Sequence, residues 1–123
     1  MKKIFDNISH EMSQLTTRRY STSFSLGIRF LNKEQHKPIY AIYGFVRFAD
    51  EIVDSFHDFN KKELFEKFKA DTFESIENKI SLNPILNSFQ WVVNTYNIPY
   101  ELITLFLNSM EMDLTKEIYN KEK

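Results

Sequence analysis

Glycine and proline are scarce in this chain, which has only two glycines and three prolines among its 123 residues. A fold of many short strands needs a turn every few residues, and those turns depend on glycine and proline. Long helices need far fewer turns. A chain of this length also allows one compact domain. We therefore predict an all-α helical bundle that spans residues 1–123 as a single unit.

Hydrophobic spacing divides the chain into segments that we expect to be helical. The predicted helices span about residues 4–20, 21–31, 32–56, 61–80, 84–96 and 99–114. The first is amphipathic, and its apolar residues at helical spacing are Ile4, Ile8, Met12 and Leu15. Lys61 and Lys62 open the fourth helix, where we expect both to be solvated charges.

Capping residues mark three of the helix starts. Asn60 is expected to cap the fourth helix, and Asn83, which precedes a proline, is expected to cap the fifth. Asn32 is expected to cap the third helix, with Gln35 as its partner in a capping box. Pro38 lies several residues inside that start, so either the helix begins nearer residue 37 or its first turns are kinked.

One face of the third helix carries polar and charged residues within an otherwise apolar segment. The residues that share this face, within an arc of roughly 60°, are Tyr43, Arg47, Asp50 and Asp54. Mg²⁺ prefers oxygen ligands and usually binds through one or two carboxylates plus substrate phosphates. The pattern is therefore compatible with a site for a divalent metal and an anion. The alternative is an ordinary solvated face on which Arg47 pairs with Asp50 or Glu51.

Three short motifs, in their order and separation, resemble the squalene/phytoene synthase family. They are Ser21-Thr-Ser-Phe24, the run from Tyr40 to Asp54, and Met110-Glu-Met-Asp-Leu114. The resemblance extends from about residue 18 to residue 119, which is nearly the whole chain. It implies the N-terminal part of the isoprenoid synthase fold, which is all-α.

The resemblance also implies a set of site residues. Asp50 and Asp54 match the family's first aspartate-rich motif, which binds Mg²⁺ ions (Mn²⁺ being an alternative) that clamp a prenyl diphosphate. Arg47 matches an arginine beside the diphosphate, so these three residues form the expected catalytic set. The residues expected to bind substrate are Ser21, Ser23, Phe24, Tyr43, Arg47 and Asp113.

Individual roles within this substrate-binding set follow from the same resemblance. Ser21 and Ser23 match small hydroxyl residues near the phosphates, and Phe24 matches an aromatic residue that lines the prenyl tunnel. Asp113 matches a polar residue that faces the cavity. For Asp113 an ordinary helix-surface acid is the alternative.

The chemistry that the resemblance implies is the head-to-head joining of two prenyl diphosphates through a cyclopropyl intermediate. The motif at Met110 is more similar to the phytoene synthase branch, in which geranylgeranyl diphosphate gives a C40 carotenoid precursor. One alternative is a squalene or dehydrosqualene synthase that uses farnesyl diphosphate. Another is a non-catalytic helical scaffold of the same superfamily.

The family's second aspartate-rich motif has no counterpart in this sequence. Asp58, Asp71 and Asp113 each lack an aspartate four residues later. We therefore expect this chain to be an N-terminal portion of a synthase that is inactive on its own. Helices that would pack against the remainder are expected to expose apolar faces, which favour self-association.

Charge and composition exclude several other classes of protein. The net charge is −1 and no basic run is present, so nucleic acid is not an expected partner. Cysteine is absent, which excludes disulfides and thiolate metal sites. The sequence contains no sustained apolar run of the kind that a signal peptide or a membrane-spanning helix requires. We expect a cytoplasmic protein, with peripheral membrane association left open, and we expect surface positions for His10, His36 and His57.

Overall fold

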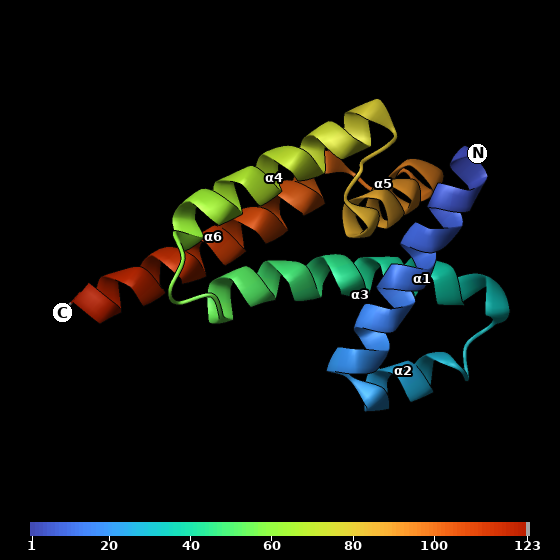
Figure 1. Cartoon of the computed structure of the whole chain (residues 1–123), viewed down its shortest axis with the longest axis horizontal. Coiled ribbons are helices and arrows are strands. Elements are labelled where there is room, and N and C mark those ends of the chain that lie inside the picture. The colour runs from blue at the N-terminus through green and yellow to red at the C-terminus, as the bar shows by residue number, and fades with distance from the viewer. Residues whose placement is uncertain (123) are drawn as a thin grey trace.

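The computed structural model describes the backbone of residues 1–122 and the side chains of residues 1–119. This part of the chain folds into six α-helices without any strand (Figure 1). The helices are α1 (Lys2–Tyr20), α2 (Thr22–Ile28), α3 (Lys33–Asp54), α4 (Lys61–Asn78), α5 (Pro84–Tyr96) and α6 (Tyr100–Glu122). The all-α prediction is therefore confirmed.

Helix α3 lies at the centre of the bundle and contacts α1, α4, α5 and α6. Figure 1 shows α4 and α6 on one side of α3, where they run side by side in opposite directions. Helix α1 crosses α3 and leads into the short helix α2. The two faces of α3 therefore have different neighbours.

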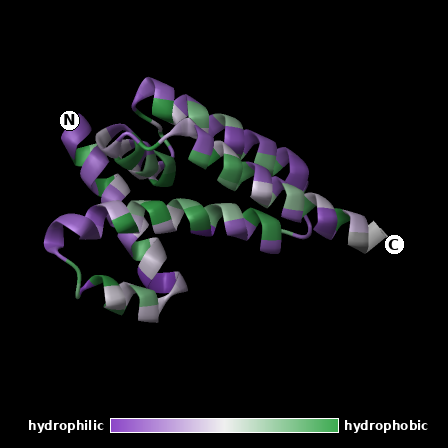
Figure 2. Ribbon diagram, turned by 180° about the vertical axis from the view of Figure 1, so that it is seen from behind, coloured by the Kyte–Doolittle hydropathy of each residue, from purple (hydrophilic) through white to green (hydrophobic). Residues whose placement is uncertain are grey.

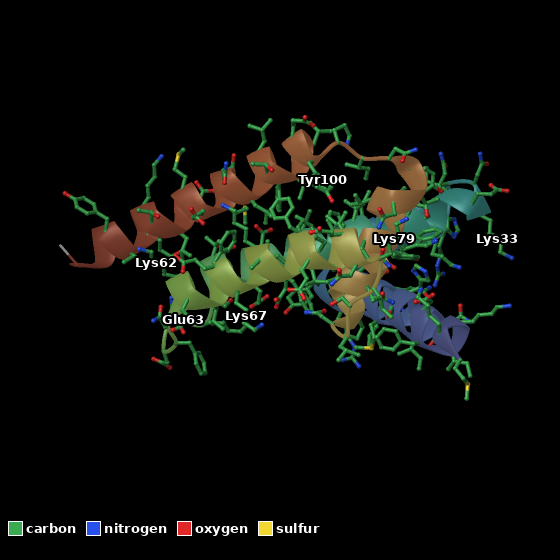
Figure 3. All side chains as sticks on the ribbon, turned by 90° about the horizontal axis from the view of Figure 1, so that it is seen from above. Lys33, Lys62, Glu63, Lys67, Lys79 and Tyr100 are labelled. Carbon is green, nitrogen blue, oxygen red and sulfur yellow. The ribbon has the colours of Figure 1, made fainter. Side chains whose placement is uncertain are left out.

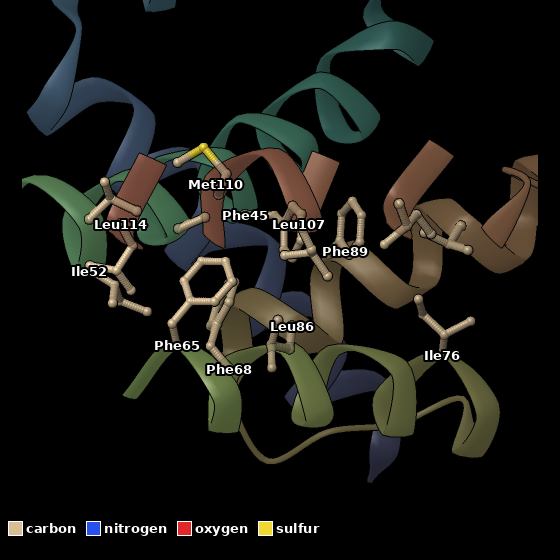
Figure 4. Packing of buried hydrophobic residues seen from close by; sticks show 14 residues of the cluster. Phe45, Ile52, Phe65, Phe68, Ile76, Leu86, Phe89, Leu107, Met110 and Leu114 are labelled. Carbon is tan, nitrogen blue, oxygen red and sulfur yellow. The ribbon is translucent and has the colours of Figure 1, made fainter. Parts of the chain in front are cut away.

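Aromatic and aliphatic side chains form the core between α3, α4, α5 and α6 (Figure 4). The Phe45 ring of α3 stacks on Phe89 of α5 with ring centroids 3.8 Å apart, and on Phe68 of α4 at 5.4 Å. Aromatic pairs of this kind add to the free energy gained by burying apolar area. The other buried members are Ala49, Ile52, Val53, Phe65, Ile76, Leu86, Val93, Ile103, Leu107, Met110 and Leu114.

Helix α1 packs through small hydroxyl residues rather than through its apolar stripe. Its buried residues are Ser9, Ser13, Thr16 and Thr17. Its exposed apolar residues include Ile4, Ile8, Met12 and Leu15. A Cβ atom on Gly44 of α3 would lie 3.4 Å from the Ser13 Oγ. The small side chains on both helices thus permit a close crossing.

Two of the three predicted caps are confirmed. The Asn60 side chain accepts a hydrogen bond from the Glu63 backbone N–H at 3.1 Å. The Asn83 side chain accepts bonds from the backbone N–H groups of Ile85 and Leu86 at 3.0 and 3.3 Å. Each cap satisfies N–H groups that have no partner within the helix.

The start of α3 agrees with the prediction in position, since Asn32 is the N-cap residue, but not in its capping bond. This helix begins at Lys33 and contains Pro38 in its interior. The Asn32 side chain makes no capping bond, so the predicted capping box with Gln35 is wrong. The Gln35 backbone N–H donates instead to the Asn32 carbonyl at 2.9 Å. The helix can include Pro38 because the missing N–H removes only one intrahelical bond near its start.

Polar and apolar positions are interspersed along the long helices, as the hydropathy colouring of Figure 2 shows. Within the described residues, no helix combines the length and the apolar character that crossing a bilayer requires.

Candidate functional site

The charged face predicted on α3 centres on Arg47, whose side chain is 23% exposed. The Arg47 Nη2 donates a hydrogen bond to the Glu51 Oε2 at 3.1 Å. The Arg47 Nη1 lies 3.8 Å from the Asp50 Oδ2, which is too long for a hydrogen bond. Arg47 is therefore bonded to Glu51, whereas its attraction to Asp50 is electrostatic only.

Tyr20, the last residue of α1, covers the guanidinium of Arg47. The Arg47 Cζ lies 4.8 Å from the centre of the Tyr20 ring, within the range of a cation–π contact. A hydrogen bond to Glu51 is the main cause that raises the pKa of Tyr20. Hydrogen bonds from Ser55 and then from Tyr20 lower the pKa of Glu51. Glu51 is thus held as an ionised carboxylate.

Asp50 lies beside this arginine, and two further aspartates act on Asp50. Asp50 is partly buried, whereas Asp54 and Asp113 are exposed. Burial raises the pKa of Asp50; the charge of Arg47 opposes that shift, and the charges of Asp54 and Asp113 add to it. Asp113 of α6 therefore lies close enough to the α3 face to repel Asp50. A cation among these carboxylates would relieve the repulsion.

The serine motif lies where α1 passes into α2. The Ser21 Oγ accepts a hydrogen bond from the Phe24 backbone N–H at 3.1 Å and caps α2. Ser23 is exposed. The Phe24 ring stacks on Tyr43 of α3, with centroids 5.0 Å apart and planes inclined by 24°. This contact brings α2 beside α3 about one helical turn before Arg47.

A buried lysine fixes the end of α3 next to Asp54. The Lys61 Nζ donates to the Val53 carbonyl at 2.5 Å and to the Glu117 Oε1 at 2.9 Å. Lys61 is 7% exposed, so its predicted position as a solvated charge is wrong. The last carbonyls of a helix lack intrahelical partners, and the ammonium group satisfies one of them. Its neighbour Lys62, labelled in Figure 3, is exposed as predicted.

The predicted surface position is also wrong for His10. Its Nδ1 lies 3.1 Å from the Ser88 Oγ, and its ring meets the Trp91 ring edge-on at 4.8 Å between centroids. Burial is the main cause that lowers the pKa of His10, and the charge of Lys37 adds to it. This histidine therefore belongs to the interface of α1 with α5.

An apolar groove of about 380 Å³ lies between α3 and α4. Its lining includes Tyr20 and Glu51, the two residues that hold Arg47. The other lining residues are Phe48, Ile52, Phe56, Leu64, Lys67, Phe68 and Asp71. Tyr20 was missed in the sequence, because a contact between the end of α1 and the middle of α3 leaves no local signature. The pairing of Arg47 with Glu51 was named in the alternative interpretation of this face, from their spacing of four residues, and it is present.

The donor set on α3 suits a metal that is shared with a phosphate ligand. Among the residues whose positions are described, His, Cys, Asp and Glu form no cluster of three or more that could hold a metal ion. Mg²⁺ does not need such a cage, since it commonly keeps several waters and binds through one or two carboxylates plus phosphate oxygens. Asp50 and Asp54, on successive turns of one helix, supply carboxylates of the required kind.

Comparison with known proteins gives one match. The family model described as squalene/phytoene synthase matches residues 17–123. No curated protein and no solved structure matches the chain. The matched range contains α2 to α6 and the end of α1, and it therefore includes every residue of the candidate site.

Proposed function

Because the chain belongs to the squalene/phytoene synthase family, whose members are prenyltransferases, we propose that the acidic face of α3 binds a prenyl diphosphate together with Mg²⁺. The observation that carries this proposal is the arrangement around Arg47. Asp50 lies 3.8 Å from Arg47 on the next turn of α3, and the negative charges of Asp54 and of Asp113 from α6 act on Asp50. The alternative, an ordinary solvated face, does not account for the partial burial of Arg47 and Asp50 on this face.

The proposed reaction begins with the breaking of an allylic carbon–oxygen bond, which leaves negative charge on the diphosphate. Arg47 would donate hydrogen bonds to the diphosphate oxygens, as guanidinium groups commonly do. Asp50 and Asp54 would hold the metal, and neither needs to act as a general base. The bound metal would neutralise part of the charge that develops on the leaving group.

Residues of α2 and its N-cap would contribute to substrate binding on the side of α3 where Tyr43 lies. The Ser21 hydroxyl accepts one bond from the α2 backbone and retains its own proton, which it would donate to a phosphate oxygen. Ser23 would bind the phosphates or metal-bound water in the same way. The stacked rings of Phe24 and Tyr43 would form an apolar wall that keeps water from the carbocation.

For the substrate we propose geranylgeranyl diphosphate and for the product phytoene, a carotenoid precursor. The support for this branch is the resemblance of Met110-Glu-Met-Asp113. The alternative is farnesyl diphosphate, with squalene or dehydrosqualene as the product. Tighter Mg²⁺-dependent binding of the C20 substrate than of the C15 substrate would favour the phytoene branch, and the reverse order would favour the alternative.

A non-catalytic scaffold remains the second candidate. A helical scaffold has no physical need for Asp50 and Asp54 beside Arg47, which is why we favour the enzyme. A cytoplasmic location, peripheral membrane association and self-association through exposed apolar residues also stay predictions. Light scattering at increasing protein concentration tests the last of these, and a monomer at every concentration would contradict it.

The proposal is tested by titrating the chain with Mg²⁺ and inorganic pyrophosphate while recording NMR spectra. We expect shifts at residues 47–54 that require both ligands. Asp50→Asn or Asp54→Asn should weaken binding roughly 10- to 100-fold, since an interaction with a charged group contributes about 1.5–3 kcal/mol. Asp71→Asn, which changes an α4 carboxylate in the same way, should bind like the wild type. An unchanged spectrum at high ligand concentration would refute the site.

A further inference from the structure

Glu51 makes more contacts around Arg47 than either aspartate of the predicted motif. Its carboxylate accepts the 3.1 Å bond from the Arg47 Nη2. The neighbouring side chains of Ser55 and Tyr20 are the main causes that lower the pKa of Glu51. The Glu51 side chain is 21% exposed, so most of it is shielded from water. Glu51 is thereby fixed from the next turn of α3 and from the end of α1.

The guanidinium of Arg47 is held on two sides as a result. Glu51 bonds one edge through Nη2, and the Tyr20 ring covers the group at 4.8 Å. The Arg47 Nε is buried and has no hydrogen-bond partner among the described side chains and backbone groups. The Nη1 is the nitrogen nearest to Asp50, at 3.8 Å from its Oδ2. This nitrogen makes no hydrogen bond to that carboxylate, and it is the one directed toward the acidic face.

We infer that Glu51 is a positioning residue that orients the Arg47 guanidinium, so that Nη1 is directed toward a diphosphate bound at Asp50 and Asp54. This inference rests on the proposed function. The acidic residues of α3 then have different roles. Glu51 binds the arginine, which leaves the carboxylate of Asp50 available for the metal. Tyr20 supports the same orientation from α1.

Orientation matters here because a flexible arginine loses conformational freedom when it binds an anion. The planar guanidinium loses less conformational entropy on binding when its rotamer is already fixed, and the affinity for the anion rises accordingly. Groups that orient a ligand-binding side chain from behind typically contribute about 10- to 100-fold to affinity. We therefore expect Glu51→Gln to weaken the binding of Mg²⁺ and pyrophosphate about tenfold. Tyr20→Phe keeps the ring and removes the hydroxyl, so its effect should be smaller.

A double-mutant cycle separates positioning from a general structural role. Pyrophosphate affinity in the presence of Mg²⁺ is measured for Glu51→Gln, Arg47→Gln and the double variant. If Glu51 acts through Arg47, its substitution has no further effect once Arg47 is replaced. An equal loss in both backgrounds would overturn the inference. Tighter binding by Glu51→Gln would also overturn it, since Glu51 would then compete with the ligand for the arginine.

Asp71→Asn is the matched control for the carboxylate-to-amide change. The Asp71 Oδ2 lies 3.0 Å from the Lys67 Nζ, also at a spacing of four residues on a helix. Both residues lie on α4 and line the apolar groove beside Glu51, but their ion pair is with each other and not with Arg47 or the aspartates of α3. Its substitution should leave pyrophosphate affinity unchanged.

A second readout needs no ligand and separates this inference from the proposed function. The Arg47 Nε–H resonance, assigned by its loss in Arg47→Gln, should exchange slowly with water in the wild type. Glu51→Gln should accelerate that exchange at least several-fold, whereas Asp71→Asn should not change it. Equal exchange in Glu51→Gln and the wild type would overturn the inference. Accelerated exchange in a protein that binds no pyrophosphate would refute the proposed function and leave the orienting role of Glu51 intact.

Discussion

The two sides of α3 are packed in opposite ways. On one side Phe45 joins an aromatic core with residues of α4 and α5. On the other side α1 approaches through serines and threonines, close to Gly44. The aromatic side is stabilised mainly by burial of apolar area. The α1 side depends on the close approach of α1 to α3, and hydrogen bonds join α1 to α5.

One asparagine of α5 bonds the first half of α1 at two points. The Asn87 Nδ2 donates to the Asp6 Oδ1 at 2.9 Å and to the Ser9 Oγ at 3.0 Å. Its Oδ1 accepts a bond from the Ser81 backbone N–H at 3.2 Å. At the other end of α1, the Tyr20 ring covers Arg47. The aromatic core therefore stabilises the bundle, whereas the packing of α1 places Tyr20 against Arg47 in the candidate site.

The largest effect is expected from the aromatic side. Phe45→Ala should lower the free energy of unfolding by about 3–5 kcal/mol, because it removes a large buried ring and leaves a cavity. Urea unfolding followed by circular dichroism measures this change. Phe30→Ala is the control, since Phe30 is 91% exposed and its loss should change stability by no more than about 0.5 kcal/mol. Equal effects of the two substitutions would contradict the account of the core.

A smaller effect is expected from the polar side. Asn87→Ala should lower the free energy of unfolding by about 1–3 kcal/mol, since it leaves buried groups without a partner. Ser13→Ala is the matched test within the same interface. The Ser13 Oγ is buried and has no hydrogen-bond partner among the described residues, so its removal should leave stability unchanged or raised. A larger loss for Ser13→Ala than for Asn87→Ala would reverse the assignment of the interface.

The smallest effect is expected from pH. The pKa of His10 is lowered in the folded protein, chiefly by burial. The unfolded chain therefore binds a proton first as the pH falls below about 6.5, and stability should decrease from that point downward. The urea concentration at the midpoint of unfolding, measured at pH 7.5 and at pH 5.5, should differ more for the wild type than for His10→Gln. The same difference in both proteins would show that His10 does not couple folding to protonation.

The parts of the fold that depend on local chemistry were predictable from the sequence. Asn60 and Asn83 cap helices because an asparagine before a helical segment satisfies nearby N–H groups whatever the tertiary structure. The core face of α3 followed from its apolar spacing in the same way. Asn32 also precedes a helix, yet its side chain makes no capping bond, and the sequence pattern does not reveal this difference.

The parts that depend on long-range contacts were not predictable. Lys61 is buried because a helix end and Glu117 meet it in space, and neither lies near it in the sequence. The apolar stripe of α1 indicated a helix but not the face that packs, since small hydroxyl residues allow the closer crossing. The charged face of α3 was predicted from spacing, whereas the contact of Tyr20 with Arg47 required the fold.

The central claim, that the acidic face of α3 binds a divalent metal with a diphosphate, is tested most directly with a paramagnetic ion. Mn²⁺ broadens the NMR signals of nearby nuclei, and it can be added with inorganic pyrophosphate to the isotope-labelled chain. The account predicts selective broadening at residues 47–54 and around Asp113, which Asp50→Asn should weaken. Broadening centred on the acidic residues of α4, or no selective broadening at saturating ligand, would contradict the claim.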